Sequence, residues 1–483
     1  MNARSGAART LILACLIPFL LAVDAGAQFG VPFARYRTFE TAHFILTFEV
    51  GLEDYARRAA ARAEAAHVLL VRAYGATPRG KIRLVIVDQG DIFNGSATPI
   101  PTNRIIAFAH TPVENDLFFT DDPVELLVTH ELAHVFHLDE ARSGWRVLRG
   151  VFGRGELTFP HLFDGSYLIE GLATFYESRL TDGGRVRGAR FAETLRAFLL
   201  ETDGPHLDEA ESDPGAWPLD RHYTFGGLFL EHVATRYGGE TAPAWMARRA
   251  GSFRSIFSRG ARVGEAFGGR SLSQEWDDWI ASERSEALRF RDRLRDSAPG
   301  LAQTTRVCDV AHQTSFPRVS PDGSAIAFLS TDEGRKPLGL YVADLETCAG
   351  RRIIRIDSAH PLAWTPDGRS IVFSQLTLVD NARLFADLFR VDVASGAVTR
   401  LTREARVTSP DVHPSGRMVA AVQYDGERSR LVTVDVQSAT ISPLTEFATE
   451  TAWGPARWSP DGTRLAAVRF TRGVSLDLVL LAA

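Results

Sequence analysis

The chain of 483 residues is too long for one ordinary hydrophobic core, and 45% hydrophobic with 23% charged residues is a normal globular balance. This composition excludes a disordered or fibrous protein and predicts two or three domains. The net charge is -5, the isoelectric point is near 6.3, and no sustained stripe of Lys or Arg occurs. We therefore expect no nucleic acid partner, because no basic field would attract a phosphate backbone.

The first 27 residues have the pattern of a secretory signal peptide. Arg4 and Arg9 precede an apolar run over residues 11–23, and Ala25 and Ala27 follow with A-x-A spacing. The 13 residues of this run fall short of the roughly 20 that a helix needs to cross a bilayer. We expect cleavage after Ala27, export to a periplasmic or secreted location, and no membrane span in the mature chain.

Strand and helix patterns alternate from about residue 36. The segment "FETAHFILTFEV" (39–50) alternates like one strand, residues 53–75 have helical spacing closed by Gly75, and residues 81–88 and 103–110 are strand-like. Helical patterns dominate after residue 120 until "SAPG" (297–300) breaks the last helix. These patterns predict an α+β domain over residues 28–296.

Residues 301–483 contain four repeats, each with an x-P-x-G turn between two β-prone segments. Pro321, Pro366, Pro414 and Pro460 stand 45, 48 and 46 residues apart, a period that suits one four-stranded propeller blade. Proline fixes φ at the turn's first central position and glycine supplies a positive φ, so each hairpin is set locally. The repeats resemble the TolB-like β-propeller family, whose members more often have six or more blades, and the array is therefore expected to be partial or small.

Closure of a four-bladed ring would require its two ends to pair. The last repeat stops one strand short of a full blade after "LDLVLLAA", and "TTRV" (304–307) is a β-prone run before the first repeat. Pairing of residues 304–307 with residues 475–481 would remove exposed strand edges, and an open array is the alternative. Cys308 and Cys348 could form a disulfide or remain buried thiols.

The stretch "VTHELAHVFHLDE" (128–140) carries the strongest chemical signal in the chain. Asp122, Pro123 and Glu125 have the pattern of an N-cap, a first-turn proline and a capping-box acid, which predicts a helix from about residue 123 to 138. His130 and His134 then stand one turn apart on one face. From there both imidazoles can reach a common metal ion at about 2.0 to 2.1 Å.

A third ligand is needed, and Glu131 is reserved for holding a carboxylate against metal-bound water. His137 lies one turn beyond His134 on the same face, but three consecutive turns of a straight helix cannot converge on one tetrahedral centre. The better candidate is Glu170 in "GSYLIEGLATFYESRL" (165–180), at the start of another helical pattern. Gly171 beside it would let two helices approach closely.

Three segments resemble the gluzincin peptidases of the MA clan: "THELAHVFH" (129–137), "YLIEGLATFYES" (167–178) and "YTFGGLFLEHVATRYG" (223–238). The resemblance covers about residues 36–290, and is to bacterial exported proteins that join such a domain to TolB-like repeats. It implies a multidomain fold with an α+β gluzincin, thermolysin-like peptidase domain followed by an all-β propeller of about four recognisable blades.

The resemblance also implies roles for individual residues. A zinc ion (Zn2+) is the implied cofactor, and its ligands would be His130, His134 and Glu170. Glu131 looks like the general base, and Tyr223 looks like the phenol that steadies the transition-state oxyanion.

Two assignments stay open at this point. His222 competes with its neighbour Tyr223 for the oxyanion role. The acid expected four residues after the glutamate ligand is Thr174 here, so the residue that orients His130 is unassigned, with Asp139 and Glu177 as candidates.

Together these features predict an exported zinc metallopeptidase acting on a peptide or protein substrate. The propeller is expected to bind a protein partner or the substrate, and residues 103–110 could be the edge strand that takes up an extended peptide. The alternative is a non-catalytic protein-binding scaffold that acts through the propeller.

Overall fold

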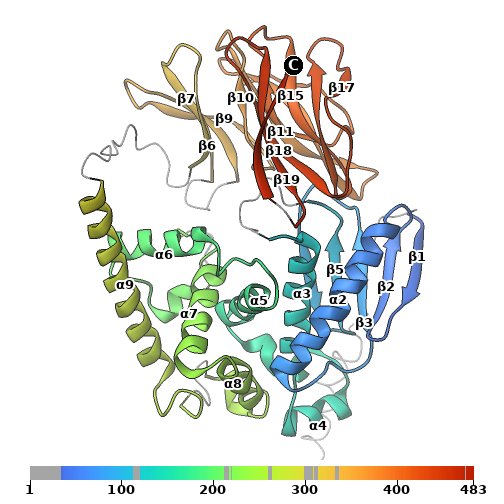
Figure 1. Ribbon diagram of the computed structural model, residues 1–483, viewed down its shortest axis with the longest axis vertical. Coiled ribbons are helices and arrows are strands. Elements are labelled where there is room, and N and C mark those ends of the chain that lie inside the picture. Colours follow the sequence, from blue (N-terminus) through green and yellow to red (C-terminus); the bar gives the residue numbers. More distant parts are fainter. Residues whose placement is uncertain are drawn as a thin grey trace, which may run out of the picture.

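A computed structural model shows an N-terminal α+β domain beneath a C-terminal β-propeller (Figure 1). It describes residues 34–111, 120–211, 217–218, 220–258, 264–298, 308, 314–331, 337–473 and 475–482. The expected signal peptide (1–27) and the run 304–307 lie outside the described residues. None of the helices within the described ranges is both long and apolar enough to cross a lipid bilayer.

A mixed five-stranded sheet in the order β1-β2-β3-β5-β4 forms one side of the N-terminal domain. Its strands are β1 (Tyr36–Glu40), β2 (Phe44–Glu49), β3 (Ile82–Val87), β4 (Gly95–Thr98) and β5 (Arg104–Phe108). The pairs β2/β3 and β3/β5 are parallel, and the outer pairs β1/β2 and β4/β5 are antiparallel. Strand β4 is therefore an edge of the sheet, and β5 lies inside it.

Two strand expectations need correction. The single strand expected over residues 39–50 is interrupted by a turn between β1 and β2, in which Thr41 N donates to Phe44 O at 3.0 Å. Thr41 Oγ1 accepts from Phe44 N, so a side chain holds this turn, and no Gly or Pro marks it in the sequence. Strand β4 was not predicted, because its sequence "GSAT" lacks the alternation of apolar and polar residues that indicates a strand.

The helix that carries the histidines is α3 (Pro123–Asp139), one residue longer than expected. The Asp122 side chain caps it by accepting from Val124 N at 3.0 Å. The capping box does not form, since Asp122 N donates to Thr120 Oγ1 and Glu125 pairs with Arg62 instead. Helix α2 (Glu53–Tyr74) ends as expected at Gly75, which has φ +62°.

The remaining helices cover the other side of the domain. They are α4 (Ser143–Phe152), α5 (Ser166–Leu180), α6 (Ala189–Glu201), α7 (Arg221–Tyr237), α8 (Thr241–Arg249) and α9 (Leu272–Ser297), with short 3-10 turns η1 (Glu156–Thr158), η2 (Pro160–Phe163), η3 (Leu207–Ala210) and η4 (Phe253–Ile256). Helix α9 ends where "SAPG" predicted a break.

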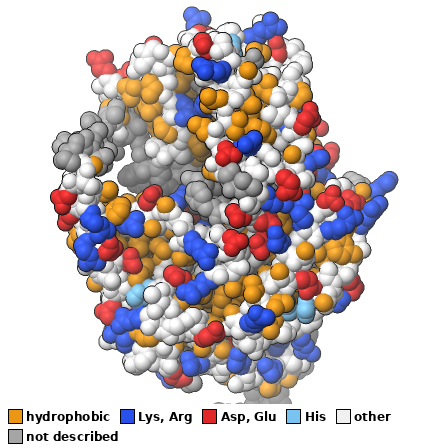
Figure 2. All heavy atoms as spheres, in the orientation of Figure 1, with side chains coloured by type: hydrophobic (Ala, Val, Ile, Leu, Met, Phe, Trp, Pro, Cys, Tyr) orange, Lys and Arg blue, Asp and Glu red, His pale blue; other side chains and the backbone are white. Residues whose placement is uncertain are grey.

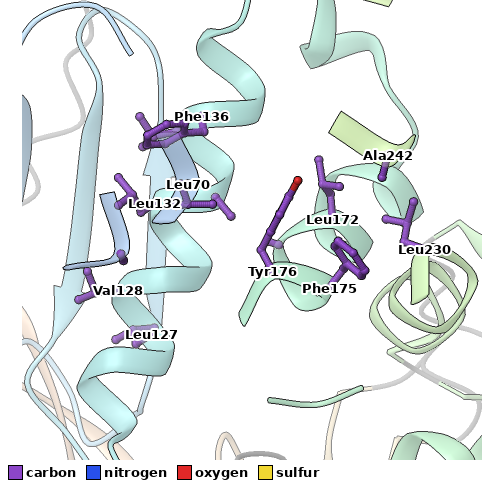
Figure 3. Packing of buried hydrophobic residues seen from close by; sticks show 14 of the residues in the cluster. Leu70, Leu127, Val128, Leu132, Phe136, Leu172, Phe175, Tyr176, Leu230 and Ala242 are labelled. Atoms are coloured by element: carbon purple, nitrogen blue, oxygen red, sulfur yellow. The ribbon is translucent and has the colours of Figure 1, made fainter. Parts of the chain in front are cut away.

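Helix α3 lies at the centre of the domain and is buried along its whole length except at Glu125. Its residues Val128, Leu132 and Phe136 belong to the same core as Leu70 of α2 (Figure 3). On the other side, Phe175 of α5 points towards Leu230 of α7, and Leu172 belongs to the same core (Figure 3). A helix packed on all sides has little freedom to shift, so α3 is a rigid base for its side chains.

Helices α5 and α7 touch backbone to backbone at two glycines, as the sequence predicted for Gly171. A Cβ added to Gly171 would lie 2.6 Å from the carbonyl carbon of Gly226, and one added to Gly226 would lie 2.1 Å from Tyr167 O. Neither backbone can yield to make room. The contact brings the first turns of α5 and α7 together, and with them Glu170 and Tyr223.

Four sheets form the four propeller blades. Blade 1 contains β6 (Thr314–Val319), β7 (Ala325–Ser330), β8 (Gly339–Asp344) and β9 (Gly350–Arg355); blade 2 contains β10 (Ala363–Trp364), β11 (Ser370–Val379), β12 (Arg383–Asp392) and β13 (Val398–Arg400). Blade 3 contains β14 (Val407–Val412), β15 (Met418–Asp425), β16 (Arg428–Asp435) and β17 (Ile441–Pro443); blade 4 contains β18 (Thr451–Trp458), β19 (Arg464–Thr471) and β20 (Ser475–Ala482).

The repeated turns work as the sequence predicted. Gly323, Gly368, Gly416 and Gly462 have φ of +77°, +68°, +74° and +73°. Three hydrophobic clusters then join blade 1 to blade 2, blade 2 to blade 3, and blade 3 to blade 4. The blades thus bury one another's faces in series.

The last blade has three strands in the described residues, and β20 pairs only with β19 there. Leu476, Leu478 and Leu480 on β20 are 58%, 77% and 66% exposed. The pairing expected between residues 304–307 and residues 475–481 involves a segment outside the described residues. The alternatives for Cys308 and Cys348 are decided, because they form a disulfide with a Cα–Cα distance of 5.3 Å.

We predict that Gly171→Ala lowers the free energy of unfolding by about 1 to 3 kcal/mol, since the added methyl group collides with the backbone of α7. Gly150→Ala in α4 is the matched control, because a Cβ there meets nothing within 4 Å. Replacing this helical glycine should raise the free energy of unfolding by up to about 1 kcal/mol. Chemical denaturation of both variants tests the difference, and equal effects would contradict the close contact.

Candidate metal centre

Three donor atoms from two helices converge in the middle of the N-terminal domain. His130 Nε2 and His134 Nε2 on α3 are 3.1 Å apart, and Glu170 Oε2 on α5 lies 3.5 Å and 3.2 Å from them. A tetrahedral metal ion with ligands at about 2.0 to 2.1 Å separates those ligands by about 3.3 to 3.4 Å. The triangle formed by these three side chains therefore has the dimensions of a metal site.

The chemistry of the donors also fits a cation. The two Nε2 atoms face each other, and two histidines in this arrangement share at most one proton between them. Glu131 Oε2 is buried nearby and has no hydrogen-bond partner among the described residues. A metal ion at the centre, with water beside Glu131, would satisfy these groups.

Glu177 on α5 orients the first histidine. Its Oε2 lies 2.7 Å from His130 Nδ1, so the ring's other nitrogen can donate here while Nε2 faces the centre. Arg185 holds Glu177 in a bidentate ion pair, with Nε to Oε1 at 2.8 Å and Nη2 to Oε2 at 2.7 Å. Burial alone would raise the pKa of Glu177, but Arg185 and His130 lower it to about 2, which keeps the carboxylate charged.

Of the two acids considered for this role, Glu177 makes the contact and Asp139 does not. Asp139 instead accepts hydrogen bonds from Asn103, Arg149 and Arg154 at the end of α3. Thr174, at the position where an acid was expected, packs against α7: a Cβ on Gly227 would lie 2.9 Å from its Cγ2. The orienting acid therefore sits one turn further along α5.

Arg185 was missed from the sequence. It follows α5 in the turn "TDGGR", where glycines and a charged residue read as an ordinary surface loop. Only the fold of this turn back against α5 shows that the guanidinium is buried beside Glu177.

Glu131 stands between the donors and the edge strand β4. It is 5% exposed, and burial raises the pKa of its carboxyl. A Cβ on Gly95 of β4 would lie 2.9 Å from Glu131 Oε1, so the strand passes directly over this carboxylate. The prediction that residues 103–110 form an edge strand is thus wrong, because β5 lies inside the sheet and β4 lies at its edge.

A cavity of about 240 Å³ opens over the donors. It is lined by Phe93, Asn94, Gly95, Ser96, Ala97, Leu126, Leu127, His130, Glu131, His134, Leu138, Ile169, Glu170, Glu177, Arg185 and Tyr223. Tyr223 comes from the first turn of α7, while its competitor His222 is not among the lining residues. Burial and the nearby Glu170 raise the pKa of Tyr223, so its phenol stays protonated at neutral pH.

His137 belongs to a second buried cluster. Its Nε2 lies 3.2 Å from Asp164 Oδ2, which also contacts His161 Nδ1 at 2.7 Å. Burial lowers the pKa of His137 to about 4, so its ring is neutral, and Arg249 balances the charge of Asp164. These residues have the donor types for a metal, but the adjoining guanidinium supplies the positive charge. The Nε2 atom of His137 thus contacts Asp164 in this second cluster.

Comparison with known proteins finds a family match for the propeller part of the chain. Residues 300–466 match the family described as "TolB beta propeller domain". The chain therefore contains a TolB-like β-propeller domain. This match covers about a third of the chain and leaves the candidate metal centre outside it.

Two curated relatives and one solved structure illustrate the similarity. The Tol-Pal system protein TolB of Francisella tularensis is 35% identical over 101 residues, 20% of this chain and 22% of that protein. The uncharacterized protein Atu1656 of Agrobacterium fabrum is 26% identical over 194 residues, 39% of this chain and 62% of that protein. The crystal structure of TolB from Acinetobacter baumannii aligns at 19% identity and a TM-score of 0.31, covering 35% of this chain and 41% of that one. The chain spans less than two thirds of the length of each.

We predict that Glu170→Ala severely weakens zinc retention, because it leaves two protein ligands, while His137→Ala does not. Equilibrium dialysis followed by metal analysis of the two purified variants checks this. His137→Ala is the control, since it removes a buried histidine from α3, the helix that carries His130 and His134. The reverse ranking would make His137 the third ligand.

Proposed function

We propose that this chain is an exported zinc metallopeptidase that hydrolyses peptide bonds. In this proposal residues 28–296 form a gluzincin-like peptidase domain and residues 301–483 an accessory propeller. The observation that carries it is the combination of the His130, His134 and Glu170 triangle with Glu131, a buried carboxylate that lies beside the metal position and is not one of the ligands. A purely structural metal site has no use for such a group.

The three donors would hold zinc, which when bound would polarise a substrate carbonyl and make a water nucleophilic near neutral pH. Glu131 then acts as general base, accepting the proton of the attacking water and returning it to the leaving amine. Its raised pKa suits this exchange, because a carboxyl buried away from water holds a proton more readily than an exposed one.

Tyr223 and Glu177 support the same reaction. The protonated phenol of Tyr223 lines the cavity and can donate a hydrogen bond to the oxygen on which negative charge develops. Glu177 fixes the ring of His130, so that the ligand needs no rearrangement during turnover.

The position of β4 at the edge of the sheet is an argument for a peptide as the substrate. Strand β4 pairs on one side with β5 in the described residues and passes over Glu131 on the way. An extended peptide can add to its free side by main-chain hydrogen bonds, which would place a scissile bond next to the base. The substrate's backbone, rather than one side chain, would then provide much of the positioning.

The disulfide bears on where the protein is located, and the propeller bears on which partners it binds. We propose export through the signal-like residues 1–27, and the bond between Cys308 and Cys348 suits an oxidising compartment outside the cytoplasm. A protein-binding scaffold is the second candidate function, favoured by the exposed leucines of β20 and by the similarity to a protein of the Tol-Pal system. In either case the propeller would contact a protein partner.

Replacing Glu131 separates metal binding from chemistry. We predict that Glu131→Gln keeps about one zinc per chain and loses on the order of 10² or more in turnover, because it removes the base and no ligand. His134→Ala should lose both. Metal analysis and digestion of a peptide library by wild type and both variants provide the test.

Two results would count against the peptidase. Cleavage by Glu131→Gln at the wild-type rate would exclude the mechanism. A wild-type chain that binds zinc and cleaves nothing in a broad library would favour the scaffold.

A further inference from the structure

The loop between β3 and β4, residues 88–94, is held by the propeller. Leu384 of β12 donates its N–H to Gln89 O at 2.8 Å and accepts from Asp91 N at 3.0 Å. These two bonds form a parallel bridge between Gly90 and Leu384. Strand β13 pairs only with residues 389–391 of β12, so the loop occupies the side of β12 that β13 does not reach.

An unusually long hairpin in blade 2 makes this contact. Strands β11 and β12 have 10 residues each, whereas the other propeller strands within the described residues have at most 8. A three-residue turn (380–382) connects the paired residues Val379 and Arg383, and in it Asp380 and Asn381 have φ of +50° and +56°. We call residues 370–392 the blade 2 hairpin.

Two arginines add charge to the contact. Arg406 donates to both oxygens of Asp88 at 2.6 and 2.8 Å and to Asp91 Oδ1 at 2.8 Å. Its side chain is 12% exposed and that of Asp91 is fully buried, so these ion pairs are only weakly screened by solvent. Arg383 donates to Glu49 Oε2 at 2.7 Å and to Asp88 O at 2.9 Å.

The held loop leads straight into the candidate site. Four residues after Asp91 the chain reaches Gly95, whose Cα faces Glu131, and Phe93, Asn94 and Ser96 line the same cavity. Strand β4 has only four residues and, in the described part of the chain, one neighbouring strand. Its position therefore depends on its two connections, and the propeller holds one of them.

From this geometry we propose that the blade 2 hairpin and Arg406 are positioning elements of the peptidase site, which hold the β3–β4 loop so that β4 presents its edge in register with Glu131. Neither element touches the metal donors. The inference rests on the proposed function, because it assigns the propeller a part in peptide binding. It also explains why a propeller would be joined to this domain: the site is complete only when the two are docked.

Arg406→Ala is the test. Amide hydrogen exchange in residues 88–98 should become faster, while zinc content and the exchange of α3 stay as in wild type. For an extended peptide, kcat/KM should fall on the order of tenfold, mostly through KM, since misplacing a binding strand weakens substrate positioning more than the base itself. Arg406→Lys should restore part of the loss.

Arg58→Ala is the matched control. Arg58 of α2 pairs with Glu427 of blade 3, in the same interface but away from the β3–β4 loop. Its removal should leave the exchange of residues 88–98 and KM close to wild type. If Arg406→Ala does not fold, Asp91→Asn tests the same contact, because it removes the charge and keeps an oxygen for Ala386 N.

Unchanged exchange in residues 88–98 of Arg406→Ala, or the same change in Arg58→Ala, would overturn the inference. A wild-type chain that cleaves no peptide would overturn the peptidase function instead. Faster local exchange in Arg406→Ala would even then show that Arg406 positions the loop.

Discussion

The burial of α3 is the constraint on which the rest of the N-terminal domain depends. The helix packs against the sheet and α2 on one side and against α5 on the other, with Glu125 the one residue of it that is partly exposed. Because a helix enclosed in this way cannot rotate or slide, His130, Glu131 and His134 are held in fixed directions. The same burial means that each polar group on α3 needs a partner, since an uncompensated charge in a core is costly.

Buried partners for α3 come from residues distant in sequence. Glu177 and Arg185 serve His130, Asp164 serves His137, and Arg149 with Arg154 serves Asp139. Each of these clusters pairs a carboxylate with an arginine, so the charges are balanced in place. Beside the candidate metal donors, Glu131 Oε2 is buried without a hydrogen-bond partner among the described residues, an environment in which carboxyl groups commonly have perturbed pKa values.

Charge also governs the contact between the two domains. Figure 2 shows acidic and basic side chains mixed across the middle of the molecule, at the level where the propeller meets the N-terminal domain. Within the contact between the two domains, Arg383 pairs with Glu49, and Arg406 pairs with Asp88 and Asp91. Interfaces of this polar kind are selective for geometry, because a misaligned pair leaves a charge without a partner.

The sequence alone determined the features that depend on local chemistry. Three features follow from short-range rules: the helical spacing of His130 and His134, the closing Gly75 of α2, and the four turns of the propeller. Turn geometry and helix periodicity act within a few residues. The convergence of Glu170 on the two histidines was foreseen from a resemblance and from the need for a third ligand, and the structure brings these donors together.

Tertiary structure decided the rest. It made β4 an edge strand and placed β5 inside the sheet, and it chose Glu177 over Asp139 as the partner of His130. It also brought Arg185 to Glu177 and Arg406 to Asp91. None of these choices leaves a local signal, because an acid or an arginine looks the same in a sequence whether it faces solvent or a buried partner. Which of the two it faces depends on how distant segments pack, and that is settled only when the whole core forms.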